Sequence, residues 1–294
     1  MADNVTLVTG ASGFLGKAVM MLLAEQKQRA IGLDPRASAT TQVVDDLSNH
    51  SKLTKLLTNE KITHIIHAGG VSGPMVLAED PLKVISINVL GSLNLLYAAM
   101  DAGVKTFIYC SSAAALGSFH ESEPVDENYP LRPNNTYSAS KAAMEMVLRG
   151  LWGRIPLDLC ALRFTVIYGP GRETTYTVEE IVTAALAGRP ARIAPMADWP
   201  YVYIDDAARA SVQACYAKGR KQLSYFIAHP ERVTPDDIAA AAAAAGKPVR
   251  IEIDASRPKA ERGPLDVESA AQDFGFRAQV GHREGVRRLI EAAR

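Results

Sequence analysis

The stretch VTLVTGASGFLGKAVMMLL, residues 5–23, decides the fold class, because a glycine-rich turn joins a short apolar run to a helical pattern. Gly10, Gly13 and Gly16 lie directly after the expected strand and at the start of the expected helix. Glycines in this placement allow a tight turn, close approach of the backbone to a pyrophosphate, and close packing of helix on strand. The unpaired N–H groups of the helix N-terminus favour phosphate. We interpret the segment as the start of a dinucleotide-binding unit.

Short apolar runs alternate with longer helical patterns over the first 165 or so residues. Strands are expected at 5–9, 29–34, 62–68, 105–111 and 157–164, and helices at about 14–27, 48–59, 81–102 and 136–151. Each strand is almost continuously apolar, which is typical of strands covered on both faces. The alternation predicts an α/β fold, a Rossmann-type doubly wound parallel sheet.

The alternation loosens after about residue 170, where helices are expected at 177–188, 205–219 and 234–246 and a strand at 223–229. We therefore expect a dinucleotide-binding domain over 1–170 that carries the catalytic residues. Residues 171–294 are expected to form a smaller, mixed C-terminal lobe that mainly binds substrate, with segments at about 200–230 returning to the main sheet.

Composition excludes several classes of function. The 32 basic and 32 acidic residues cancel, so no electrostatic footprint suggests nucleic acid or an anionic membrane. We find no apolar run long enough to cross a membrane and no signal peptide, and we expect a cytoplasmic protein. The three cysteines (Cys110, Cys160, Cys215) are odd in number and lie in apolar stretches, which indicates buried free thiols. The histidines lack metal-ligand spacing, so no metal is expected.

Asp34 ends the second strand, where an acidic side chain accepts hydrogen bonds from the ribose hydroxyls of NAD and repels a 2′-phosphate. Arg36, two residues later, could pair with that phosphate. NAD is therefore the expected cofactor, and NADP is the less favoured alternative.

The stretch TYSASK, residues 136–141, places Tyr137 and Lys141 four residues apart on one face of a helix. A free tyrosine has a pKa of about 10, and a nearby cation stabilises the phenolate and lowers that value. Tyr137 is thus a candidate acid/base and Lys141 a candidate group for tuning it. In the alternative, Thr136 caps an ordinary helix, Tyr137 packs and Lys141 is solvated.

Eight motifs occur in one order along the chain: TGASGFLG (9–16), DDL (45–47), HAGG (67–70), NVLGSLNLL (88–96), CSSAAALG (110–117), YSASK (137–141), LRFTVIYGPG (162–171) and YVYIDDAARA (201–210). Together they resemble the extended branch of the short-chain dehydrogenase/reductase superfamily, the NAD-dependent epimerase/dehydratase family. The resemblance implies an NAD-dependent oxidoreductase that transfers a hydride at a secondary alcohol.

The resemblance also implies roles for individual residues. Ser112 would hydrogen-bond the substrate oxygen beside Tyr137 and Lys141, and Ser111 is the fallback for Ser112. With the glycine-rich turn and Asp34, the expected cofactor-binding residues are Gly10, Ser12, Gly13, Phe14, Leu15, Gly16, Asp34, Asp46, Leu47, Ala68, Gly69, Gly70, Asn88, Tyr137 and Lys141. Asp46 and Leu47 would lie at the adenine and Asn88 on a proton path. His67 is expected to shape the cofactor loop.

The chain departs from the nucleotide-sugar epimerases it resembles. Val166 stands where those enzymes usually have a diphosphate-binding asparagine, and Trp199-Pro200 stands where they often have Arg-Asp. We therefore predict a small sugar, sugar acid or hydroxy acid as substrate. The first alternative is a nucleotide-sugar 4-epimerase, similar to UDP-glucose 4-epimerase, and the second is a catalytically silent NAD(P)-binding scaffold. Candidate substrate-binding residues are Ser72, Ser111, Ala113, Arg172, Trp199 and Arg257.

Relatives commonly dimerise through the two long helices that match residues 81–102 and 136–151. Both segments are rich in alanine, leucine and methionine, as a helical interface requires. The resemblance therefore implies a homodimer, although the same faces could pack on the sheet instead.

Overall fold

A parallel seven-stranded sheet forms the centre of the computed structural model, which describes residues 4–196, 198–257, 259 and 262–293. The strand order is β10-β6-β5-β4-β1-β2-β3. These strands are β1 (Val5–Thr9), β2 (Arg29–Asp34), β3 (Val43–Val44), β4 (His64–His67), β5 (Thr106–Ser112), β6 (Asp158–Phe164) and β10 (Ser224–Ile227). The chain proceeds from β1 to β3 on one side and then crosses to β4 on the other. The predicted doubly wound sheet is therefore confirmed.

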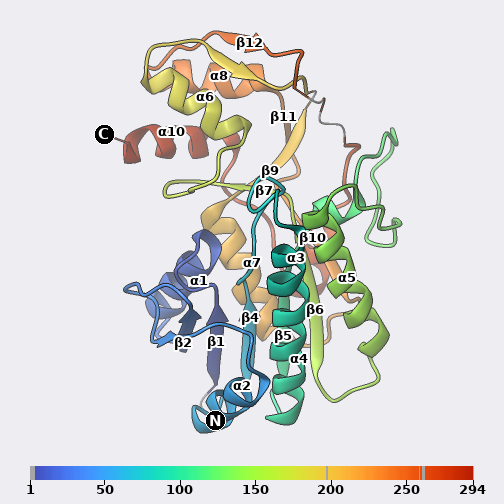
Figure 1. The fold of residues 1–294 in the computed structure, drawn as a ribbon. Helices are drawn as coiled ribbons and strands as arrows, with labels where there is room; N and C mark the ends of the chain where they lie inside the picture. Colours follow the sequence, from blue (N-terminus) through green and yellow to red (C-terminus); the bar gives the residue numbers. More distant parts are fainter. Residues whose placement is uncertain (1–3, 197, 258, 260–261, 294) are drawn as a thin grey trace.

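Helices cover both faces of this sheet (Figure 1). One face carries α1 (Phe14–Glu25) and α7 (Ile204–Tyr216); the other carries α2 (His50–Asn59), α3 (Pro81–Ile85), α4 (Ser92–Asp101) and α5 (Thr136–Leu151). Successive residues of β1 serve opposite layers, since Leu7 packs in the core beneath α2, α4 and α5 and Val8 in the core beneath α1 and α7. This two-sided burial explains the continuous apolar character of the strands.

A smaller lobe lies beyond the carboxyl ends of the main strands, at the top of Figure 1. It contains α6 (Thr177–Leu186), α8 (Pro235–Ala244), α10 (His282–Ala292) and the paired strands β8 (Ala191–Ile193) and β12 (Ile251–Ile253). A three-stranded sheet contains β7 (Val166–Tyr168), β9 (Trp199–Tyr203) and β11 (Arg232–Val233). Between β9 and β11 the chain returns to the main sheet as β10, which lies beside β6, and α9 (Glu268–Phe274) packs on β10. The exact boundary at residue 170 stays a prediction.

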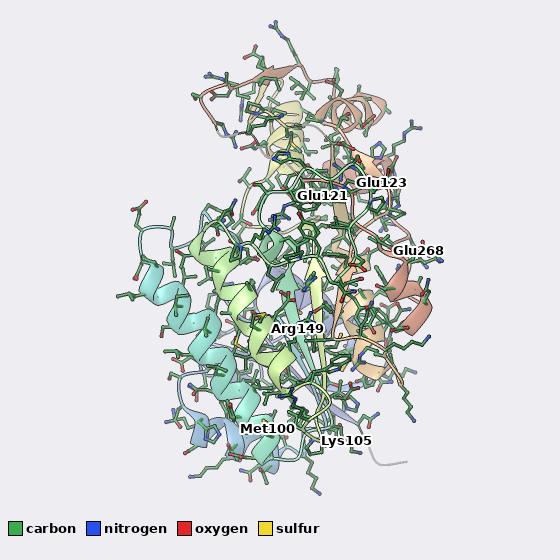
Figure 2. All side chains as sticks on the ribbon, turned by 90° about the vertical axis from the view of Figure 1, so that its right-hand side faces the viewer. Met100, Lys105, Glu121, Glu123, Arg149 and Glu268 are labelled. Atoms are coloured by element: carbon green, nitrogen blue, oxygen red, sulfur yellow. The ribbon has the colours of Figure 1, made fainter. Side chains whose placement is uncertain are left out.

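Figure 2 shows the two ends of the molecule from the side. Met100, near the end of α4, and Lys105, just before β5, lie at the end where the strands begin. Glu121 and Glu123 lie towards the opposite end, in the segment that precedes α5. The loops that follow the parallel strands therefore converge on the side nearer the smaller lobe, which is where ligands bind in such sheets.

Short elements account for most differences from the sequence prediction. Strands β3, β7, β8, β11 and β12 contain two or three residues each, too few for a hydrophobic period to identify. The cap of α5 also differs, because Asn135 rather than Thr136 accepts a hydrogen bond from the Ser138 N–H. The Ser138 hydroxyl reciprocates at the Asn135 N–H, which forms a capping box. The three cysteines are free and buried, as expected.

The helical run from Pro81 to Asp101 corrects one expectation about membranes. It is 21 residues long with a mean hydropathy of 1.4, enough to cross a membrane by length and composition alone. A π-helical turn, Ser86–Gly91 (η1), joins α3 to α4 within it. The run lies in a helical layer of the sheet and packs against α2 and α5. Length and composition are therefore weak evidence for a span here.

A buried ion pair connects α5 to the sheet. Arg163 on β6 and Glu145 on α5 are 1% and 2% exposed, and Arg163 Nη2 lies 2.7 Å from Glu145 Oε2. Arg163 also donates to the Glu127 carbonyl oxygen (2.8 Å), and the Glu127 carboxylate accepts from the Phe226 N–H and the Ser269 hydroxyl. Since every charge of the pair is satisfied by a partner, the pair ties β6, α5, β10 and the segment before α5 together.

Replacing one member of this pair leaves the other charge buried without its partner. We expect Arg163→Met to lower the free energy of unfolding by about 3–5 kcal/mol. The double variant Glu145→Gln with Arg163→Met removes both charges and is expected to recover most of that loss. Urea denaturation measures all three proteins, and a strictly additive double variant would contradict the pairing.

Candidate active site

The glycine-rich turn brings the ends of β1 and β4 into direct backbone contact. Gly10 has φ +70°, and a Cβ at this position would lie 2.7 Å from the Gly69 Cα. A Cβ on Gly16 would lie 2.0 Å from the Gly10 carbonyl oxygen. Both positions therefore require glycine. Helix α1 begins after Gly13 without any side-chain cap, so its first N–H groups face the turn and suit a phosphate.

Asp34 lies at the carboxyl end of β2, beside the turn. Its carboxylate accepts from the Ser12 N–H (3.1 Å) and the Arg36 N–H (2.8 Å), and the residue is buried. The Ser12 hydroxyl donates to the Arg36 carbonyl oxygen (2.6 Å), which closes the β2–β3 loop over the turn. The Arg36 guanidinium points to Glu173 in an exposed ion pair of 3.5 Å. Carboxylate oxygens accept more than one hydrogen bond, so Asp34 retains capacity for ribose hydroxyls.

His67 links the same turn to the long helix. The Nδ1 atom of His67 lies 2.6 Å from Thr9 Oγ1, and Thr9 Oγ1 accepts a hydrogen bond from the Gly69 N–H. The Nε2 atom lies 2.7 Å from Ser92 Oγ, and the Ser92 hydroxyl donates to the Asn88 carbonyl oxygen. These directions place the proton on Nε2, because Ser92 has already used its own hydrogen. Burial and the Lys141 charge lower the pKa of His67 to about 3. The neutral imidazole connects Thr9, which holds Gly69, to Ser92, and the role of His67 in shaping a cofactor loop stays a prediction.

Asn88 lies in the π-helical turn and connects three segments. Its Oδ1 accepts from the Val71 N–H (2.7 Å), and its Nδ2 donates to the Val71 carbonyl oxygen (3.2 Å) and to Ser140 Oγ (2.9 Å) on α5. The wider turn projects the side chain between the loop after β4 and the helix of Tyr137. The proton path implied for Asn88 stays a prediction.

Ser112 and Tyr137 form the centre of the candidate site. The Ser112 hydroxyl oxygen accepts from the Ala114 N–H (3.1 Å), so its own hydrogen is available to Tyr137. The pKa of Tyr137 lies above its ordinary value, because burial and Tyr176 raise it by more than the hydrogen bond from Ser112 and the nearby cations lower it. These cations are Arg262 and Arg172. The pair thus places a proton donor and acceptor side by side, as alcohol oxidation requires.

Lys141 lies one helical turn after Tyr137 on α5, and its ammonium group donates to a backbone carbonyl oxygen of β5. Its Nζ donates to the Cys110 carbonyl oxygen (2.9 Å) and lies 4.9 Å from the centre of the Tyr109 ring. Burial lowers the pKa of Lys141 to about 8. The described cations that act on Tyr137 are Arg262 and Arg172. The tuning role predicted for Lys141 stays a prediction.

The smaller lobe contributes two cation–aromatic pairs near Tyr137. The Arg172 guanidinium lies 4.5 Å from the Tyr176 ring centre, and the Arg262 guanidinium 4.9 Å from the Trp199 ring centre. Burial lowers the pKa of Arg262 to about 10. Arg262 was not among the residues predicted from the sequence. From this segment of the sequence, Arg257 was the arginine predicted to bind substrate.

Other predicted residues lie in varied settings. Arg257 binds Glu180 through both terminal nitrogens (3.0 and 3.2 Å), and the Ser111 hydroxyl donates to Glu145 (2.5 Å). Phe14 and Leu15 begin α1, Asp46 accepts a hydrogen bond from the Ser48 N–H, and Leu47 packs beside Gly91. Ala68 and Gly70 follow β4. Ser72 is exposed, and Ala113 is buried. Their ligand contacts stay predictions.

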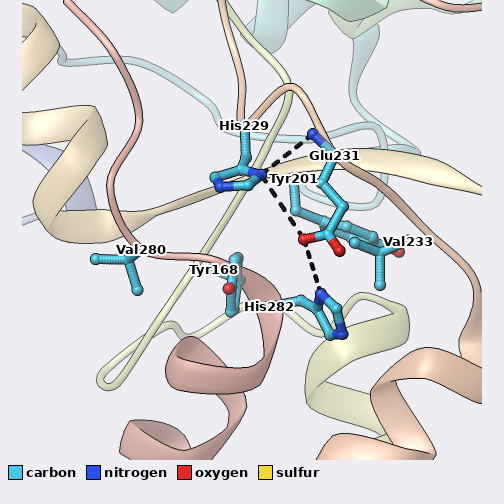
Figure 3. Close-up of a pocket in the computed structure, with 7 residues that line it drawn as sticks. All are labelled: Tyr168, Tyr201, His229, Glu231, Val233, Val280 and His282. Atoms are coloured by element: carbon cyan, nitrogen blue, oxygen red, sulfur yellow. Dashed lines mark hydrogen bonds and ion pairs between the residues drawn. The ribbon is translucent and has the colours of Figure 1, made fainter.

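A small pocket at the junction of the lobes is separate from this site. Figure 3 shows its polar centre, where Glu231 Oε2 lies 2.9 Å from His282 Nδ1 and 3.9 Å from His229 Nδ1. Tyr168 also lines it, but Ser112, Tyr137 and Lys141 do not. No group of three or more histidine, cysteine or acidic side chains suited to a metal occurs among the described residues.

Known proteins resemble this chain over nearly its whole length. UDP-glucose 4-epimerase of Mycolicibacterium smegmatis is 29% identical, with 97% of each chain covered. The structure of Thermus thermophilus UDP-glucose 4-epimerase complexed with NAD matches with a TM-score of 0.87, 27% identity and 98% coverage of both chains. MoeE5 in complex with UDP-glucose and NAD matches with a TM-score of 0.86, 25% identity and coverage of 99% and 98%.

The family comparison accounts for the arrangement of the turn, Asp34 and the Ser112–Tyr137 pair. The model of the NAD dependent epimerase/dehydratase family matches residues 6–228, which include all three features. The chain belongs to the NAD-dependent epimerase/dehydratase family and is an NAD-dependent enzyme of the extended short-chain dehydrogenase/reductase type.

Proposed function

We propose that the protein oxidises a secondary alcohol of a nucleotide-linked sugar with NAD and returns the hydride, as a sugar 4-epimerase does. Sequence analysis ranked this reading behind a small free sugar or sugar acid. The full-length similarity to UDP-glucose 4-epimerases and the NAD- and UDP-glucose-bound neighbours support the alternative. The single observation that carries it is that Arg172 and Arg262, each held over an aromatic ring, both act electrostatically on Tyr137.

Two guanidinium groups beside the acid/base suit an anionic substrate. Among the described residues, neither Arg172 nor Arg262 forms an ion pair with a carboxylate, whereas Arg257 does. Arginine pairs strongly with phosphate, and partial burial strengthens that pairing. These cations offset the loss of the asparagine and Arg-Asp positions on which the free-sugar prediction was based.

In the proposed reaction each residue has one task. Tyr137, as phenolate, takes the hydroxyl proton, and Ser112 donates to the substrate oxygen and holds it beside Tyr137. Bound NAD would supply the acceptor for the hydride that leaves the carbon and the donor for its return. Tyr137 then gives its proton back to the new hydroxyl. Return of the hydride to the opposite face of the sugar ring inverts the carbon, so an epimerase accumulates no NADH.

Loss of the Tyr137 hydroxyl removes the acid/base. We expect Tyr137→Phe to lower kcat about 100-fold or more while NAD binding changes little, because general acid–base catalysis contributes roughly 10²–10⁴-fold. The assay follows UDP-glucose and UDP-galactose by chromatography and NADH by absorbance. Steady growth of NADH with a free sugar would instead favour the dehydrogenase. Absence of turnover with every substrate would favour the catalytically silent scaffold.

Arg262 and Arg257 offer a matched comparison of two arginines in one segment. We expect Arg262→Met to raise KM for a nucleotide sugar about 10-fold or more, since a charge-assisted contact near Tyr137 is lost. Arg257→Met, which removes the bond to Glu180, is expected to change KM little. Initial-rate kinetics measure both variants. Equal effects would show that Arg262 acts through the stability of the segment.

We also propose that the protein is a cytoplasmic homodimer. Apolar side chains that are unusually exposed for their size lie along the two helices predicted to form the interface: Leu82, Ile87, Leu90 and Tyr97 on the α3–α4 run and Met146 on α5. The spacing of Leu82, Leu90 and Tyr97 keeps them on one helical face, and α5 packs beside α3. A continuous apolar face of this kind fits a second copy of the chain.

Met146 and Met21 allow a matched test of the dimer, because their exposed fractions are 58% and 59%. We expect Met146→Glu to give a monomer by analytical ultracentrifugation, since a charge would be buried at the interface. Met21→Glu on α1 is expected to leave the dimer intact. A monomeric parent protein, or a dimer that tolerates Met146→Glu, would refute the interface.

A further inference from the structure

Two neighbouring serines at the end of β5 serve opposite sides of the strand. Ser112 bonds Tyr137 in the candidate site, and Ser111 is buried and donates to Glu145 Oε1 at 2.5 Å. Because the Ser111 hydroxyl is already donated to a buried carboxylate, only the Ser112 hydroxyl is available to the substrate. Ser111 therefore has a task other than the fallback role that the sequence suggested.

The partner of Ser111 is held rigidly. The Glu145 carboxylate accepts from Arg163 Nε at 2.9 and 3.2 Å and pairs with Arg163 Nη2 at 2.7 Å. Arg163 is the residue directly opposite Ser111 in the register of β5 and β6. The sheet thus positions the carboxylate, and the carboxylate positions Ser111.

Besides the bond from Lys141 Nζ to the Cys110 carbonyl oxygen, two side-chain hydrogen bonds join the end of β5 to α5. Ser111 binds Glu145, and Ser112 binds Tyr137, which lies two turns earlier on α5. The first bond is buried and complete without ligand, whereas the second must exchange partners with the substrate oxygen. Because the Ser111–Glu145 bond does not change during the reaction, it keeps the end of β5 at one distance from α5 while Ser112 exchanges partners.

We propose that Ser111 and Glu145 are positioning residues that hold Ser112 at hydrogen-bonding distance from Tyr137. The proposal rests on the proposed function only for the roles of Ser112 and Tyr137. It predicts that loss of the Ser111 hydroxyl lets the end of β5 move relative to α5. The Ser112–Tyr137 bond then weakens, although both side chains remain.

The effect on pH dependence follows from what faces Tyr137. Four groups act on Tyr137 electrostatically: Ser112 from the end of β5, Tyr176 from the start of α6, Arg172 from the loop after β7, and Arg262 from the loop before α9. Tyr137 in turn raises the pKa of Tyr109 within β5. Only the Ser112 contact depends on Ser111 directly. A donor to the phenolate lowers the pKa of Tyr137, so its loss raises that pKa.

Ser224 supplies a matched control. Its hydroxyl donates to the other oxygen of the same carboxylate, Glu145 Oε2, at 3.2 Å, and it is also buried, but it lies on β10, away from Ser112. Ser111→Ala and Ser224→Ala therefore each remove one donor from Glu145. Only Ser111→Ala removes a hydrogen bond that holds the end of β5 to α5.

We expect Ser111→Ala to lower kcat about 10-fold with little change in KM, and Ser224→Ala to keep kcat within about twofold. The acid limb of the kcat profile, where Tyr137 must lose its proton, should move to higher pH in Ser111→Ala only. Urea denaturation shows whether both variants lose similar stability. Equal kcat and equal pH profiles in the two variants would overturn the proposal.

A second readout does not depend on turnover. In protein with ¹³Cζ-labelled tyrosine, the Tyr137 resonance is identified by its absence in Tyr137→Phe. Its chemical shift reports the hydrogen bond from Ser112, and it should change in Ser111→Ala but not in Ser224→Ala. An unchanged shift in Ser111→Ala refutes the positioning role. If the shift changes but the parent protein turns over no sugar substrate, the proposed function fails and the positioning role stands.

Discussion

Where β1 and β4 end, the backbone at Gly10 passes so close to Gly69 that a Cβ on Gly10 would lie 2.7 Å from the Gly69 Cα. This approach occurs at the point where the strand order reverses, between the two halves of the sheet. Thr9, His67 and Ser92 then carry a directed hydrogen-bond chain from Gly69 to the helix that holds Asn88. The cofactor turn and the helices behind the site are therefore fixed by one contact between two glycines.

Polar groups in the core extend this control to the catalytic helix. Burying Glu145 and Arg163 costs desolvation free energy, which their mutual attraction and their further hydrogen bonds must offset. A hydrophobic pair could fill the same volume. A directional pair in addition fixes where α5 lies relative to β5 and β6, because charge-assisted bonds tolerate little change in distance. The Ser112–Tyr137 pair proposed for catalysis depends on that relative placement.

The smaller lobe adds two cations near Tyr137 to the Lys141 of the Rossmann part. Arg172 and Arg262 come from segments about 90 residues apart, and each guanidinium lies over an aromatic ring. The rings hold the cations without neutralising them, so the charges remain available to an anionic group. Sequence reasoning selected Arg172 and Trp199 but chose Arg257 instead of Arg262. Five positions in a loop without periodicity cannot distinguish an arginine that faces the site from one that binds Glu180.

The alternation of strands and helices up to about residue 170, the glycine-rich turn, Asp34 and the family could be predicted from the amino-acid sequence alone. These features are local or depend on hydrophobic period and residue spacing, which the chain displays directly. Only the tertiary structure decided that Ser111 faces Glu145 while Ser112 faces Tyr137, that Lys141 bonds the Cys110 carbonyl, and that Arg262 reaches the site. Those contacts join residues from different elements. Packing, and the need to pair every buried polar group, decide which residues become partners. A local sequence pattern carries no information about such partners.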